Sequence, residues 1–129
     1  MSRALFAALA VVILSGCLRE RDRLDVPRVT LELEDSIVFA GYTVRGRAWA
    51  VDGTGLIFFQ VTAETSDSIS GDRRSRISVD SVLIEFALPV SGQAQVDERV
   101  IIEALARDNQ EFEITATDTI YVRARQSPP

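Results

Sequence analysis

The side chains that most often carry out enzymatic chemistry are scarce in this chain. The sequence has no histidine, no lysine and a single cysteine, Cys17. Histidine is the commonest general base, and histidine and cysteine are the usual zinc ligands and members of nucleophilic sites. Paired carboxylates can act as acid and base, but the acidic residues here mostly alternate with apolar ones, as on the solvated face of a strand. We therefore predict that the protein is not an enzyme.

The one thiol follows a segment with the features of a secretion signal. A basic start with Arg3 precedes an apolar run of 11 residues, 4–14, and Ser15 and Gly16 then lead to Cys17. A membrane-spanning helix needs about 20 apolar residues, whereas this length and the small residues after it are typical of a cleaved signal peptide. A short anchor and an ordinary secretory signal are the alternatives. The second would leave an unpaired thiol in an oxidising compartment.

Leu14-Ser15-Gly16-Cys17 resembles the lipobox of bacterial lipoproteins. The resemblance covers residues 1–17 and implies cleavage between Gly16 and Cys17, a thioether-linked diacylglycerol on Cys17, and an acyl chain such as palmitate on the freed amine. Two or more acyl chains hold a protein stably on a bilayer. In these lipoproteins Asp after the cysteine is an inner-membrane retention signal in some enteric bacteria; Leu18 stands there instead. We therefore expect a lipid-anchored protein of the cell envelope, in the outer membrane if the host has one.

The rest of the chain is the right size for one domain. Removal of residues 1–16 would leave 113 residues, enough for one domain and too few for two. It would also remove Arg3, so the net charge would go from −5 to −6; an acidic domain without a basic stripe is a poor nucleic-acid binder. We expect a lipidated cysteine and tether at 17–27 that reaches about 35 Å, a folded domain at 28–125 and a disordered tail at 126–129.

The apolar residues of the domain alternate with a period of two, which predicts strands. The expected strands are 29–33, 37–39, 42–51, 56–64, 78–90, 99–107 and 112–123. Turn residues stand at 52–55, 70–72, 91–92 and 108–109, at the spacing of a sandwich. The polar segment 67–76 is interpreted as a long loop or a poorly formed edge strand. The fold class is therefore all-β.

Two segments of the chain have the same form. They are Arg47-Ala48-Trp49-Ala50-Val51-Asp52-Gly53 and Glu103-Ala104-Leu105-Ala106-Arg107-Asp108-Asn109. In 46–56 and 102–109 the chain resembles bacterial immunoglobulin-like and cadherin-like domains. The resemblance spans about 28–125 and implies a single antiparallel β-sandwich of about seven strands, with the two segments as strands B and F. The chain departs from antibody domains because it lacks both the B to F disulfide and a tryptophan on strand C.

The two aspartates that end these segments are the sharpest local candidates for a site. In an immunoglobulin-like sandwich the loops after strands B and F emerge at the same end, so Asp52 and Asp108 are expected to approach each other. With Asn109, Glu111 and backbone carbonyls they offer oxygens of the kind that calcium prefers. The alternative is that each aspartate only makes local turn hydrogen bonds. The chain lacks the Asp-x-Asn-Asp-Asn run of cadherins, and we expect no cofactor or metal beyond the covalent lipid.

The outward faces of the strands offer a second kind of site. If Ala48 and Ala50 face the core, the outward residues of the same strand are Arg45, Arg47, Trp49 and Val51. On the other sheet the expected outward apolar residues are Leu56, Phe58, Ile101 and Leu105. Exposed tryptophan and arginine are typical of interface hot spots, and apolar patches mark contact sites. The alternatives are that the segment 67–76 covers the apolar patch, or that the inward and outward faces are reversed, since a register error of one residue moves every side chain to the other face.

These patterns together predict a lipid-anchored, non-catalytic module that binds a protein or has a structural role in the envelope. Its expected partners are the bilayer, through the acyl chains, and an envelope protein that the sequence does not identify. One alternative is recognition of carbohydrate or calcium by an immunoglobulin-like domain. Another is the role of an accessory subunit in an envelope enzyme or transport complex.

Overall fold

The computed structural model describes residues 26–125 and shows six strands. They are β1 (Arg28–Leu33), β2 (Ile37–Val38), β3 (Thr43–Glu64), β4 (Ile69–Pro89), β5 (Arg99–Asp108) and β6 (Glu113–Val122). The predicted all-β class is confirmed. The predicted cleavage site, Cys17 and most of the tether lie outside the described residues, as does the predicted tail at 126–129.

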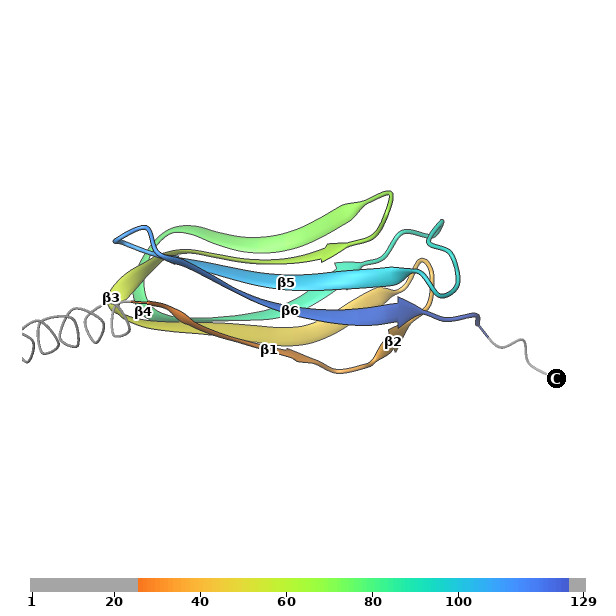
Figure 1. The fold of residues 1–129 in the computed structure, drawn as a ribbon, viewed down its shortest axis with the longest axis horizontal. Helices are drawn as coiled ribbons and strands as arrows, with labels where there is room; N and C mark the ends of the chain where they lie inside the picture. The colour runs from red at the N-terminus through yellow and green to blue at the C-terminus, as the bar shows by residue number, and fades with distance from the viewer. Residues whose placement is uncertain (1–25, 126–129) are drawn as a thin grey trace, which may run out of the picture.

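The two longest strands belong to both layers of the sandwich. The first half of β3 pairs with β1 and with the second half of β4, whereas its second half pairs with β5 and with the first half of β4. Figure 1 shows both strands bending at the same end of the molecule and returning along the other layer. β6 follows β5, and β2 closes the order as a short parallel partner of β6. The two halves of β3 and β5 thus occupy the positions of strands B, C and F in an immunoglobulin-like sandwich.

The core lies between the layers and is built from alternate residues of each strand. Ala48 and Ala50 of β3 and Ala104 and Ala106 of β5 are fully buried, as the inward orientation of both alanine pairs predicts. Larger side chains, such as Phe59, fill the centre of the core. Small residues on the two facing strands let the sheets approach closely at this point.

The prediction that Leu56 lies on an outer face with Phe58 is wrong. Leu56 is fully buried, because β3 changes register between Val51 and Leu56 and again between Leu56 and Phe58. Gly55, with a φ of 103°, helps to form this irregularity. An extra residue in a strand reverses the face on which the following side chains lie. Residues 59, 61 and 63 therefore face the core, while Phe58 faces outward.

The prediction of a loop or poor edge strand at 67–76, with a turn at 70–72, is also corrected by the structure. Residues from Ile69 onward belong to β4 and extend the sheet beside β3. Gly71 pairs with Thr62, and a Cβ there would meet the Thr62 methyl and the Val61 carbonyl oxygen at 3.1 Å each, so glycine serves close packing rather than a turn. The real turn is at 65–68, where the Thr65 N–H donates to the Ser68 carbonyl at 2.9 Å.

Within residues 26–125 no helix is long and apolar enough to cross a membrane.

Candidate functional site

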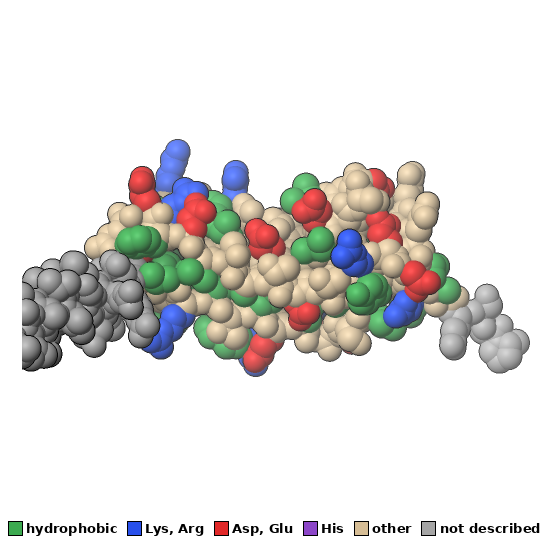
Figure 2. All heavy atoms as spheres, in the orientation of Figure 1, with side chains coloured by type: hydrophobic (Ala, Val, Ile, Leu, Met, Phe, Trp, Pro, Cys, Tyr) green, Lys and Arg blue, Asp and Glu red, His purple; other side chains and the backbone are tan. Residues whose placement is uncertain are grey.

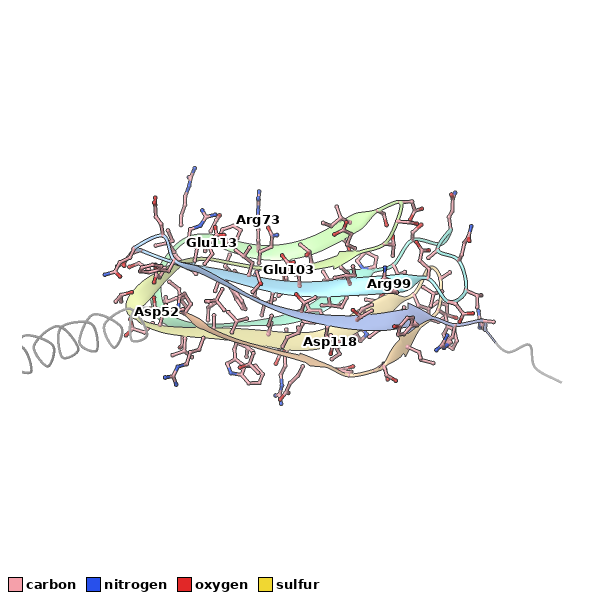
Figure 3. The ribbon with its side chains drawn as sticks, viewed as in Figure 1. Asp52, Arg73, Arg99, Glu103, Glu113 and Asp118 are labelled. Atoms are coloured by element: carbon pink, nitrogen blue, oxygen red, sulfur yellow. The ribbon has the colours of Figure 1, made fainter. Side chains whose placement is uncertain are left out.

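The bent end of the sandwich brings Asp52 and Asp108 together. Asp52 lies at the bend of β3, as Figure 3 shows, and Asp108 is the last residue of β5, where its backbone pairs with Leu56 just after that bend. Their exposed fractions are 3% and 0%. The predicted approach of the two residues is present, and it places two carboxyl groups inside the sandwich rather than on exposed loops.

Each aspartate also holds its own turn together. Asp52 accepts hydrogen bonds from the Thr54 hydroxyl at 2.8 Å and from the Thr54 N–H at 3.4 Å. The Oδ1 atom of Asp108 accepts from the N–H groups of Gln110 and Phe112, both at 2.9 Å. These are the local turn bonds expected of an aspartate followed by glycine or asparagine. The Oδ2 atom of Asp108 is buried and has no hydrogen-bond partner among the described residues.

Burial and proximity both act on the ionisation of Asp52. Desolvation raises the pKa of Asp52 above its ordinary value of 3.8, and the charge of Asp108 raises it further, while the Thr54 hydrogen bonds act in the opposite direction. Two buried carboxylates side by side are unfavourable, and one proton between them relieves the repulsion. Asp52 therefore holds its proton more tightly than an exposed aspartate does. The pair does not present a carboxylate to a substrate, because both groups are sequestered.

Asn109 joins the two turns. Its side-chain amide donates to the Thr54 carbonyl oxygen, and its backbone N–H donates to the Gly55 carbonyl at 3.0 Å. Glu111, the other oxygen donor considered from the sequence, is exposed. In residues 26–125 no group of three or more His, Cys, Asp or Glu side chains is arranged to hold a metal ion.

The first outer face, here called the Trp49 face, is the outward side of β1, the first half of β3 and the second half of β4. Arg45, Arg47 and Val51 are exposed and Trp49 is half-buried. The Arg47 guanidinium carbon lies 5.6 Å from the centre of the Trp49 ring, and its Nε donates to Glu32 Oε2 at 2.9 Å. The outward orientation predicted for this set is therefore what the structure has.

Leu83 belongs to the Trp49 face but was missed from the sequence. It pairs with Trp49 across β3 and β4 and is 53% exposed. A shallow hollow of about 440 Å³ runs beside it, lined in part by Arg47, Trp49 and Val51. Leu83 stands between Val82 and Ile84 in the sequence, so alternation alone does not assign its side; only the register of β4 against β3 does.

The second outer face, here called the Phe58 face, is the outward side of the second half of β3, β5 and β6. Phe58 and Leu105 are half-buried there and lie diagonally across the β3–β5 pair, because Phe58 pairs with Arg107 and Gln60 with Leu105. The Arg107 guanidinium carbon lies 5.6 Å from the centre of the Phe58 ring, and its Nε donates to Glu113 Oε1 at 2.7 Å. In Figure 3 Arg73 projects outward from the neighbouring β4.

Charges of both signs are distributed over the side of the molecule that carries β5 and β6. Figure 2 shows acidic and basic side chains interspersed there, with hydrophobic side chains between them. They do not gather into a basic stripe on this side of the described domain. Such a mixture is typical of the solvated surface of a folded domain.

No family model matches the chain, and no curated protein matches its sequence. Among solved structures, it is similar to the sporulation control protein Spo0M from Bacillus subtilis, with a TM-score of 0.54 and 15% identity over 78% of this chain and 50% of that chain. It is also similar to the PKD domain of a peptidase from a Thermoplasmatales archaeon, with a TM-score of 0.47 and 17% identity over 78% of this chain and 95% of that one. The chain thus spans about half the length of the Spo0M chain. At this identity the likeness to the Spo0M chain concerns the fold alone. The strand pairing itself is that of a β-sandwich with the B, C and F positions of the immunoglobulin-like order.

Proposed function

We propose that the protein is a lipid-anchored module of the bacterial cell envelope that binds a partner protein without catalysing a reaction. The anchor is supported by the motif Leu14-Ser15-Gly16-Cys17 after an apolar run of 11 residues. Cys17 carries the diacylglycerol, residues 17–27 form the tether and residues 28–125 form the module.

The absence of catalysis is supported by the state of the carboxyl pair. Asp52 and Asp108 are the buried acidic residues of the described domain, and their oxygens hold turns or face each other. A general acid or base must reach the proton that it transfers in a bound substrate. Neither of these two groups has that access.

The Phe58 face is the surface that we assign to the partner protein. The observation that carries this assignment is the cluster of Phe58, Leu105 and Arg107 near the bent end of a continuous sheet, on two strands that are each paired along both edges. Aromatic and arginine side chains provide much of the binding energy of protein interfaces. Strands β3 and β5 hold these side chains rigidly, so little conformational entropy is lost when they are covered.

The anchor is tested by membrane fractionation of wild type and Cys17→Ala in the native host. Wild type is expected in the membrane fraction and in solution only with detergent, while Cys17→Ala is expected to lose this behaviour. Continued detergent-dependent extraction of the Cys17→Ala protein would overturn the anchor.

The partner surface is tested by crosslinking in intact cells followed by mass spectrometry. Phe58→Ala is expected to lose the captured protein. The matched control is Ile69→Ala, which removes a 64% exposed apolar side chain from the neighbouring β4, at the other end of the same layer. If Phe58→Ala retains its melting temperature and its set of captured proteins, the Phe58 face is not the interface.

A further inference from the structure

Apolar surface is left uncovered on the Trp49 face. Val51 and Leu83 are 46% and 53% exposed. Trp49, which is half-buried and pairs with Leu83, lines the hollow of about 440 Å³ together with them. Residues of the described domain do not cover this group. Single exposed apolar side chains are common on folded domains, whereas a contiguous exposed group such as this one marks a contact site.

Trp49, Val51 and Leu83 occupy the part of the Trp49 face that is nearest to the start of β1. Arg28, the first residue of β1, pairs with Val51 at the bend of β3, and Figure 1 shows β1 beginning at that bent end. Ten residues, 18–27, lie between Cys17 and Arg28 along the sequence, and the eleven steps from one to the other span at most about 40 Å when fully extended. A domain anchored through Cys17 would therefore hold this face close to the bilayer surface.

The chemistry of the group suits the boundary between lipid headgroups and acyl chains. Tryptophan is enriched at that boundary because its ring is apolar and its N–H is polar, and arginine extends its charge toward the headgroups. Arg28 stands across from Val51, and Arg47 stacks on Trp49. Since the chain is acidic overall, with a net charge of −5, this contact depends on apolar insertion more than on charge. Tethering compensates for a small contact area because it raises the local concentration of the partner surface.

We propose that Trp49, Val51 and Leu83 dock on the surface of the bilayer to which Cys17 anchors the domain. This inference rests on the proposed anchor. Two attachments, one covalent and one through the Trp49 face, fix the orientation of the domain. The Phe58 face belongs to the opposite layer and is then directed away from the membrane.

The chain supplies both the coupling site and the reporter for a test. Cys17 is its only cysteine and Trp49 its only tryptophan. A chain that begins at Cys17 contains every strand and the whole core, and its thiol can be joined by a thioether to a maleimide lipid in phosphatidylcholine vesicles. Brominated acyl chains in the vesicles quench tryptophan that inserts beside them. We expect loss of Trp49 emission and a blue shift on brominated vesicles, but no loss when the same domain is free in solution.

A matched control moves the reporter to the other layer. The double variant Trp49→Phe, Phe58→Trp is expected to remain unquenched on the same vesicles, and Leu83→Glu is expected to abolish the quenching of Trp49 while the near-ultraviolet circular dichroism stays native. Equal quenching of the reporter at both positions would overturn the proposal, because docking would then have no preferred face. Absence of quenching at Trp49 would also overturn it, as would a shift that appears only after a detergent extract of envelope proteins is added.

The vesicle test does not depend on how the cell processes the chain. If Cys17→Ala remains with membranes in the host, the proposed anchor fails, while the coupled domain still reports whether the Trp49 face docks. If the anchor is confirmed but Trp49 is not quenched, only the docking inference fails.

Discussion

Asp52 and Asp108 lie side by side inside the bent end of the sandwich, close enough that the charge of one raises the pKa of the other. The two residues are 56 positions apart in the sequence, one on β3 and the other on β5. Each completes a turn, and together they place a titratable pair where water has little access. This relationship makes the stability of the domain depend on pH in a definite direction.

The substitution Asp52→Asn is expected to stabilise the domain at neutral pH. The folded protein holds the Asp52 proton more tightly than the unfolded chain, so the contribution of this group is present below pH 3.8 and is lost as pH rises through the raised pKa. Asparagine removes the charge, still accepts from Thr54 and can donate to the unpaired Oδ2 atom of Asp108. Urea unfolding should show a gain of about 1 kcal/mol at pH 7 that disappears near pH 3. A loss of stability that is equal at both pH values would contradict this account.

The substitution Asp108→Ala is expected to destabilise the turn between β5 and β6. It removes the acceptor for the N–H groups of Gln110 and Phe112 and should cost about 1–3 kcal/mol in chemical unfolding. Asp108→Asn keeps an acceptor in place and serves as the control. If both variants unfold at the same urea concentration, the turn bonds contribute nothing measurable.

The substitution Glu98→Gln tests a group of hydrogen bonds that connects two loops at the opposite end of the domain. Glu98 accepts from the Ser66 hydroxyl and N–H, and from the Gln95 N–H; these bonds lower the pKa of Glu98 below its ordinary 4.5. Its contribution is therefore present above pH 4.5 and is lost as pH falls through the lowered pKa. Glu98→Gln should lower the melting temperature at pH 7, and the difference from wild type should close in acid. If the difference in melting temperature between Glu98→Gln and wild type widens in acid, the hydrogen bonds do not favour the charged form of Glu98.

The substitution Gly46→Ala is expected to strain the layer that contains β1. A Cβ at this position would lie 2.4 Å from the Glu32 carbonyl oxygen and 2.7 Å from the Phe86 ring, so backbone and core would both have to move. Overpacking of this kind costs about 1–3 kcal/mol. Gly53→Ala is the control, because a Cβ there meets nothing within 4 Å. Equal melting temperatures for the two variants would mean that β1 can move away from the added methyl group without loss of stability.

Removal of calcium is expected to leave the melting temperature unchanged. The Asp52 and Asp108 oxygens are engaged in turns or face each other, and the Asn109 amide is bonded to Thr54. Calcium needs six to eight oxygen ligands. A melting temperature that rises with calcium and falls again with a chelator would restore the hypothesis of a metal site.

The sequence predicted those parts of the structure that depend on local alternation. The inward alanines of β3 and β5 followed from a period of two, and so did the outward Arg47 and Trp49. The side occupied by Leu56 did not follow, because the register change in β3 depends on its pairing with two other strands. The turn predicted at Gly71 was wrong for a similar reason. Glycine is needed there because the Thr62 side chain of the paired strand packs against it, and a contact between strands is not visible in the local sequence pattern.

The site was predictable to the same extent. The repeated form of the two segments, together with the resemblance to immunoglobulin-like domains, predicted that Asp52 lies near Asp108, because the loops after strands B and F emerge at the same end of such a sandwich. The outward position of Leu83 could not be predicted in this way. Both of its sequence neighbours, Val82 and Ile84, are also apolar, so alternation does not show which of the three face the core. A surface assembled from three strands requires the register of all three.

The direction in which β1 runs has a mechanical consequence. β1 starts at the bent end and lies antiparallel to β3 along six residue pairs. A pull on the tether, opposed by a partner held on the other layer, would act along β1 and load these backbone hydrogen bonds together. Loaded in shear, these bonds would have to break together and not one at a time, so a domain anchored through Cys17 as proposed would resist such a force.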